Sequence, residues 1–197
     1  MWRALVGENH PNTLTTANNL GVALREAGDL AGSEAVLRET LATRREALGE
    51  DHPNVGESLL NLAITVERRG RLDEAESMLR DAGKLLDASF ADGHPLTATV
   101  EMNLGRLLHA RLRTEEALPH LERAVRLRTG IMGATNVRTG EAQLWLGRCL
   151  DTLRRFDEAE AALAAAHSAF TAGYGPDHKS TREAADALKR VRRRRAS

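Results

Sequence analysis

The chain has 197 residues, of which 42% are hydrophobic and 28% are charged, and its 28 basic side chains balance 28 acidic ones. This is the composition of a soluble, folded protein. Cys149 is the only cysteine, which excludes an intramolecular disulfide framework, and no apolar run is long enough for a signal peptide or a membrane-spanning helix. We therefore expect a cytoplasmic protein without a membrane partner.

A pentapeptide recurs along the chain. It reads Gly-Glu-Asn-His-Pro at 7–11, Gly-Glu-Asp-His-Pro at 49–53 and Ala-Asp-Gly-His-Pro at 91–95, and it changes to Gly-Ala-Thr-Asn-Val at 133–137 and Gly-Pro-Asp-His-Lys at 175–179. Its fourth residues follow one another at intervals of 42: His10, His52, His94, Asn136 and His178. A fixed period of this length predicts a tandem array, which buries its core by stacking neighbouring repeats and leaves a long groove.

The array divides the chain in order into a partial repeat at 1–6, four repeats at 7–48, 49–90, 91–132 and 133–174, and a final segment at 175–197. Residues 2–6 align with 44–48, the tail of a second helix, so the chain begins within a repeat. Two interpretations are open. The chain is a fragment of a longer protein, or its exposed end pairs with another copy, which predicts a monomer or a weak homo-oligomer.

The second repeat shows most clearly how one repeat folds. Gly49 suits a left-handed turn after a helix, Asp51 or His52 can cap the next helix, and Pro53 suits its first turn. The apolar spacing continues to Gly70, and a second helix begins two residues later. Low aromatic content (3%) and the absence of strand-like alternation favour an all-α fold.

Small residues recur where the two helices of a repeat would cross most closely: Gly21 and Ser33, Ala63 and Ala75, Gly105 and Ala117, Gly147 and Ala159. Leucines fill the adjoining layers: Leu20, Leu62, Leu104 and Leu146 on the first helices, and Leu37, Leu79, Leu121 and Leu163 on the second. Each repeat therefore uses the same pattern of packing positions.

This pattern resembles the tetratricopeptide repeat, through Leu20-Gly21 with Ser33, Leu37 and Thr40 and the corresponding residues of later repeats. The 42-residue length and the run Leu-Gly-Glu-Asp-His-Pro at 48–53 are similar to the kinesin light chain type of the family. The resemblance implies a right-handed α-solenoid. Leu112 and Arg154 depart from it, because they stand where the turn between the paired helices should have glycine.

Residues 179–195 predict a lone capping helix that ends in Arg192–Arg195. This basic run could attract nucleic acid or a membrane, or its cations could face the negative end of the helix dipole. We favour the second interpretation because only one short segment is basic and no aromatics are interleaved for stacking on bases.

Enzyme and metal chemistry have little support. Histidines on successive repeats should lie ~8–10 Å apart, whereas zinc needs ligand atoms ~2.0–2.1 Å away, so we expect the histidines to cap helices. Cys149 aligns with Ala23, Thr65 and Leu107, which indicates a packed small residue. There is no phosphate-binding loop and no hydrolase motif, so we predict neither a cofactor nor an enzyme.

The groove carries the functional prediction. In tetratricopeptide arrays the first helices line the concave face, which implies a peptide-binding groove here formed by Asn19, Asn61, Asn103 and Trp145, an apolar strip of Leu60, Met102 and Leu144, and cations at Arg106, Arg148 and Arg190. Amides could pair with the backbone of an extended peptide. Alternatively, these asparagines bond neighbouring helices. RNA binding is disfavoured because Glu57, Glu67, Glu141 and Asp151 should face the same groove.

We thus expect a protein-interaction module that binds an extended peptide with apolar and acidic side chains. The alternative is a structural or sensory part of a larger regulatory protein, such as a kinase or signalling ATPase, that contacts its own upstream domain.

Overall fold

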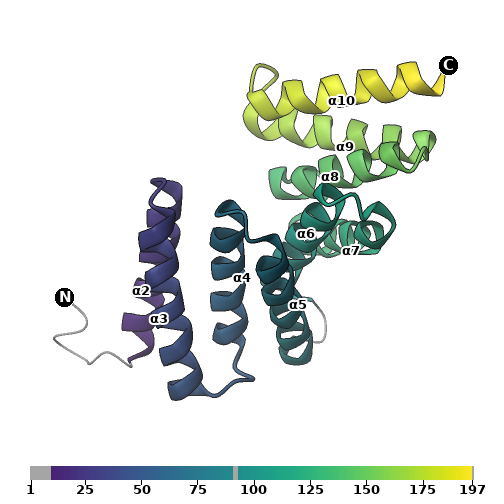
Figure 1. Cartoon of the computed structure of the whole chain (residues 1–197). Helices are drawn as coiled ribbons and strands as arrows, with labels where there is room; N and C mark the ends of the chain where they lie inside the picture. The colour runs from purple at the N-terminus through teal and green to yellow at the C-terminus, as the bar shows by residue number, and fades with distance from the viewer. Residues whose placement is uncertain (1–9, 91–92, 197) are drawn as a thin grey trace. The chain divides into compact units, whose positions relative to one another are not determined.

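The computed structural model describes residues 10–90 and 93–196, and the only regular secondary structure in this part of the chain is helical (Figure 1). The chain divides into two compact units, Met1–Asp92 and Gly93–Ser197. The first contains α2 (Pro11–Glu26), α3 (Leu30–Leu48), α4 (Pro53–Arg68) and α5 (Leu72–Ser89). The second contains α6 (Pro95–Ala110), α7 (Thr114–Met132), α8 (Val137–Thr152), α9 (Phe156–Tyr174) and α10 (Lys179–Arg195).

These bounds confirm the predicted all-α fold of paired helices, with α10 as the lone last helix. Even-numbered helices are the first helices of the repeats and odd-numbered ones the second. The partial repeat expected at 1–6 lies outside the described residues, and the division into one solenoid of four repeats stays a prediction.

The recurring histidine caps the first helix of its repeat. Each Nδ1 accepts a hydrogen bond from the backbone N–H two residues later, at 3.2 Å for His10, 3.1 Å for His52, 3.2 Å for His94 and 3.2 Å for His178. In the fourth repeat the Asn136 side chain does the same, with its oxygen 2.9 Å from the Arg138 nitrogen. The expected capping role is confirmed, and His52 rather than Asp51 is the cap of α4.

The turn between paired helices keeps one geometry in all four repeats. Its left-handed residue is Gly28 (φ 90°) or Gly70 (φ 84°) in the first unit. In the second unit Leu112 (φ 62°) and Arg154 (φ 60°) adopt the same backbone region, although they carry side chains. The turn therefore keeps its backbone geometry where Leu112 and Arg154 replace glycine.

Small residues allow the two helices of each repeat to touch. A Cβ atom placed on Gly21, Gly105 or Gly147 would lie 2.5, 2.6 or 2.6 Å from the Cγ of Leu37, Leu121 or Leu163. The leucines on the second helices are fully buried, so the predicted packing pattern is confirmed. Leu20 differs from its counterparts: it is 52% exposed, whereas Leu62 is completely buried, because no described helix precedes α2 to cover it.

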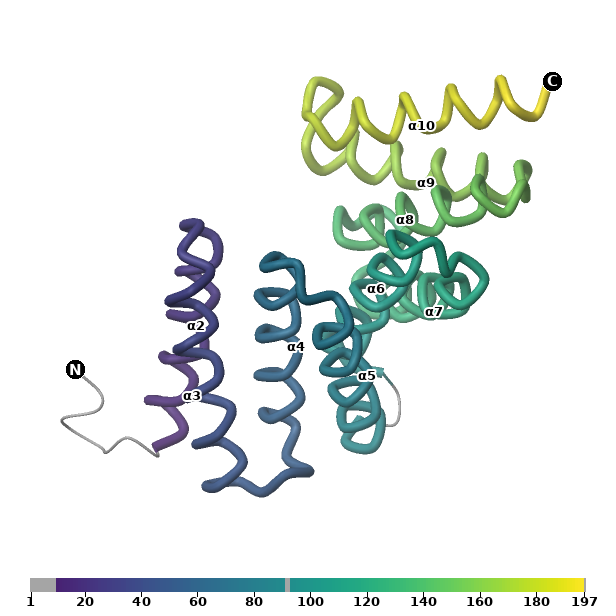
Figure 2. Tube along the Cα trace, in the orientation of Figure 1, coloured from purple at the N-terminus to yellow at the C-terminus, as the bar shows by residue number. Residues whose placement is uncertain are grey.

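Within each unit the first helices lie closer to one another than the second helices do. The backbones of α2 and α4, α6 and α8, and α8 and α10 come into contact, whereas among the described residues no two second helices of one unit approach each other as closely along the backbone. Figure 2 shows the course of these helices. The first helices therefore line the inner side of each unit, as the resemblance implies, and the second helices form the outer side.

Candidate functional site

An indole beside two guanidinium groups marks the inner side of the second unit. Trp145 of α8 is half-buried, with the Cζ of Arg148 4.8 Å and the Cζ of Arg106 6.0 Å from its ring centroid. At these distances both cations can be attracted to the ring face. We call Arg106, Trp145 and Arg148 the Arg–Trp cluster. Three of the predicted groove residues therefore come together.

The cluster has polar neighbours that fix its orientation. Arg106 donates a hydrogen bond to the side-chain oxygen of Asn103 (3.4 Å), and Arg148 forms an ion pair with Glu183 of α10. The Asn103 amide is only 6% exposed and donates to the backbone oxygen of Thr99 (2.8 Å). Asn103 therefore supports the cluster rather than presenting a free amide to the groove.

The asparagines of the first unit divide between two roles. Asn19 of α2 is exposed on its helix. Asn61 of α4 is half-buried and donates a hydrogen bond to the side chain of Asn18, at 3.3 Å. The Asn61 amide therefore bonds a neighbouring helix, joining α4 to α2, as the alternative interpretation of these asparagines predicts. The repeat pattern did not indicate Asn18, because its counterparts Leu60 and Met102 are apolar.

The expected apolar strip is wrong for two of its three members. Leu60 is 2% exposed and Leu144 is 6% exposed, because both pack into the core beneath the inner side, and Leu144 belongs to the apolar cluster shared with α9 and α10. Met102 is half-buried. The chemistry of the inner side in the second unit is thus aromatic and cationic more than aliphatic.

Buried arginines tie two of the second helices, α3 and α7, to the first helix that follows each of them. Arg44, 1% exposed, donates to the backbone oxygen of Asn54 (2.7 Å) and the hydroxyl of Ser58 (2.9 Å), and it pairs with Glu57 (3.0 Å). Arg128 occupies the same position two repeats later and pairs with Glu141 at 3.4 Å. Burial lowers the pKa of Arg128 despite this partner. Sequence reasoning missed both, since arginine is rarely so buried.

A second missed feature is a charge cluster on the first unit, formed by Glu34 of α3 with Arg38, Arg69 and Arg71. Arg38 contacts the Glu34 carboxylate at 2.8 Å, and Arg69 and Arg71 also pair with it. Burial acts to raise the pKa of Glu34, but hydrogen bonds and charge from Arg71 and Arg38 outweigh it and lower the pKa to about 2. The cluster holds α3 against the α4–α5 turn.

The C-terminal arginines have partners within the second unit. Arg192 pairs with Glu160 at 2.8 Å, Arg194 with Asp151 at 2.7 Å, and Arg195 with Glu160 at 2.8 Å. These acids belong to α8 and α9, so the basic run binds α10 to the helices beneath it. This favours the capping interpretation over attraction to nucleic acid or a membrane.

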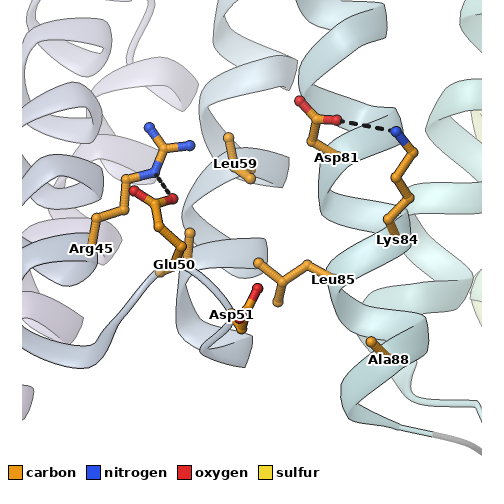
Figure 3. A pocket seen from close by; sticks show the side chains of 9 residues that line it. Arg45, Glu50, Asp51, Leu59, Asp81, Lys84, Leu85 and Ala88 are labelled. Atoms are coloured by element: carbon orange, nitrogen blue, oxygen red, sulfur yellow. Dashed lines mark ion pairs between the residues drawn. The ribbon is translucent and has the colours of Figure 1, made fainter.

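A hollow of about 340 Å³ opens on the outer side of the first unit, between α3 and α5 (Figure 3). Val55, Leu59 and Leu85 give it an apolar wall, and the rim carries two ion pairs, Arg45–Glu50 at 2.9 Å and Asp81–Lys84 at 3.6 Å. No predicted site residue lines it. Asp51 also lines the hollow, so three carboxylates face two cations and the lining is weakly acidic.

Reactive groups are not clustered in the described part of the chain. Among those residues no three His, Cys, Asp or Glu side chains could share a metal ion. Cys149 is fully buried with its sulfur 3.5 Å from the Thr114 oxygen. Burial, and then the nearby Glu122, raise the pKa of its thiol to about 11. Cys149 is therefore a packed residue, as expected. No helix between residues 10 and 196, leaving out 91–92, has the length and apolarity needed to cross a bilayer.

Paired helices with small residues at their crossings and first helices turned inward define a helical repeat protein, a class that generally provides non-enzymatic scaffolds for protein interactions. Sequence profiles described as tetratricopeptide repeat match residues 18–88 and 113–173. The chain belongs to the tetratricopeptide repeat family.

Solved structures share the fold. A putative kinesin light chain from Podosopora anserina with nearly identical TPR-like repeats has a TM-score of 0.79 at 20% identity, covering 95% of this chain and 89% of the other. BtubC (BKLC) from P. vanneervenii has a TM-score of 0.73 at 19% identity, covering 94% and 80%. A Rap protein complexed with competence and sporulation factor has a TM-score of 0.71 at 15% identity, covering 93% and 49%. No curated protein sequence gives a significant match.

Proposed function

We propose that the protein is a cytoplasmic interaction module that binds an extended segment of a partner protein on the inner side of its first helices. The observation that carries the proposal is the Arg–Trp cluster. Its indole is half-buried, so one part is held by the fold while the rest is accessible. Aromatic and arginine side chains are enriched among the residues that contribute most to protein interfaces.

The chemistry of the inner side favours an acidic ligand with apolar side chains. Arg148 is 24% exposed, and Arg190 on α10 is exposed and has no ion pair within the described residues. A carboxylate can accept two parallel hydrogen bonds from one guanidinium group. In the first unit, Asn19 is the amide that remains available for the backbone of a peptide. Glu141 and Glu183 lie on the same helices, which disfavours nucleic acid.

A pull-down with the full chain as bait, followed by peptide mapping of the captured protein, tests the proposal. Changing Arg106 and Arg148 to Ala should weaken binding of the mapped peptide and flatten its salt dependence, because exposed charges act over a Debye length of ~8–10 Å. Arg113→Ala is the matched control, since this arginine lies at the start of α7, away from the inner side. Equal affinity in all three proteins would place the binding site elsewhere.

A second candidate function follows from Leu20. The protein would then be a structural or sensory part of a larger regulatory protein, with α2 contacting another domain or another copy. Leu20 is 52% exposed at a position that is buried in α4 and α6. Leu20→Asn should abolish such a contact, measured as the sedimentation coefficient against concentration, while leaving peptide binding unchanged. Identical sedimentation of the parent and the variant at all concentrations would exclude self-association through α2.

A further inference from the structure

Glu183 has a different environment from the acids at the same position of earlier repeats. Glu57 pairs with the buried Arg44 at 3.0 Å, and Glu141 pairs with the buried Arg128 at 3.4 Å. In those repeats the carboxylate is directed at an arginine of the preceding second helix, which needs a charged partner because it is buried.

The preceding second helix of Glu183 offers no such arginine. Phe170 of α9 stands at the position of Arg128, one repeat later, and it is 1% exposed in the core. Glu183 therefore has no buried cation to neutralise, and it pairs instead with Arg148 of the Arg–Trp cluster. Its own side chain remains 48% exposed.

We propose that Glu183 competes with the peptide ligand for Arg148. In the free protein Glu183 pairs with the Arg148 guanidinium group, and in the complex an aspartate or glutamate side chain of the bound segment takes its place. This inference rests on the proposed function of the inner side. An acidic residue of the ligand would displace Glu183 and take the guanidinium group that Trp145 already holds in position. Exchange is inexpensive because ion pairs this exposed contribute little.

The geometry also determines which part of the ligand is recognised. The Arg148 Cζ lies 4.8 Å from the centroid of the Trp145 ring, so the indole restricts the guanidinium group, and a restricted guanidinium group favours a carboxylate that can accept two parallel bonds. An apolar or aromatic neighbour of that acid could rest on the accessible part of the indole. The site thus selects an acidic residue beside an apolar one, and competition from Glu183 modestly lowers the affinity for it.

Random dodecapeptides displayed on phage, selected separately on the full-length parent, Glu183→Gln and Glu158→Gln, provide the test. Glu158 is a matched control because it is an exposed acid paired with Arg155 on α9, 57% exposed, and its change alters the net charge equally. The peptide most enriched on the parent protein is then synthesised and titrated into each variant by calorimetry.

We expect Glu183→Gln to bind the acidic peptide up to about fivefold more tightly than the parent, and Glu158→Gln to bind it equally. In an Arg148→Ala background, Glu183→Gln should have no effect, because the residue for which the two carboxylates compete is gone. Equal affinity in Glu183→Gln and the parent would overturn the inference while leaving the proposed function intact. Failure of every variant to select a common peptide sequence would overturn the proposed function, and the inference with it.

Discussion

Gly147 and Leu163 touch where α8 crosses α9, and a Cβ atom on residue 147 would lie 2.6 Å from the Leu163 Cγ. Contact this close leaves no room for a methyl group unless the helices move apart. The interval between α8 and α9 is thus set by the absence of a side chain at residue 147.

Gly147→Ala should lower the free energy of unfolding by about 1–2 kcal/mol, because the cost of overpacking exceeds the gain in helix propensity. Gly130→Ala in α7 is the control: a Cβ there meets nothing within 4 Å, so it should raise stability by about 0.5–1 kcal/mol. Urea unfolding of both variants measures the difference. A Gly147→Ala protein more stable than the parent would show that the crossing is not tightly packed.

Leu112→Gly should stabilise the protein by about 1 kcal/mol. Leu112 holds a left-handed φ of 62° and is 87% exposed, so the change relieves backbone strain and loses almost no packing. The reciprocal change, Gly70→Ala, introduces a side chain at the same turn, where φ is 84°, and should destabilise by about 1 kcal/mol. The midpoints of thermal unfolding measure both changes. Midpoints that shift in the same direction for the two variants would contradict this account of the turn.

Local features of the fold were predictable because each depends on few neighbouring residues and occurs several times. The cap at His52, the turn at Gly70 and the crossing at Gly147 all follow from one repeat read against the next. Chemistry that depends on a particular neighbour was less predictable. Leu60 and Asn18 occupy equivalent positions and both are buried, but Leu60 packs in the apolar core whereas Asn18 accepts a hydrogen bond from Asn61.

The partners in the charge networks could not be predicted from the 42-residue spacing, because these networks join residues of different helices through long side chains. Glu34 meets Arg69 and Arg71, which follow it by a whole helix. Glu183 pairs with Arg148 because Phe170 of α9 stands where the equivalent acids of earlier repeats find a buried arginine. In each case the repeat determines the position of the residue, and the packing decides its partner.

Glu34 should make stability depend on pH in the acid range. Its folded pKa of about 2 lies below the ordinary value of 4.5, so the carboxylate stabilises the folded state above about pH 4.5, and this contribution is lost as the pH falls towards 2. Glu34→Gln should remove that part of the pH dependence. Unfolding free energies measured between these limits that fall equally in parent and variant would show that other acids control it. Glu39→Gln on the same helix serves as a control.

His52→Ala should cost about 0.5–2 kcal/mol, because it leaves the Asn54 N–H without the acceptor that now lies 3.1 Å away. His52→Asn should cost much less, since Asn136 caps α8 in the same way at 2.9 Å. Denaturant unfolding compares the two variants. If both lost the same stability, the histidine ring would act through packing rather than through its Nδ1 atom.

Deleting residues 180–197 should destabilise the second unit and promote self-association. Ala184 and Val191 of α10 are buried in one apolar cluster with Phe170 of α9, so removing the helix exposes core residues to water. A matched control keeps the helix and changes Arg192, Arg194 and Arg195 to Gln. Exposed ion pairs contribute about 0–1 kcal/mol each, so the control should stay monomeric and lose far less stability, measured by sedimentation and urea unfolding. A shortened chain as stable and monomeric as the parent would mean that neither the apolar face nor the arginines of α10 contribute to stability, and that the apolar end of α8 and α9 needs no cap.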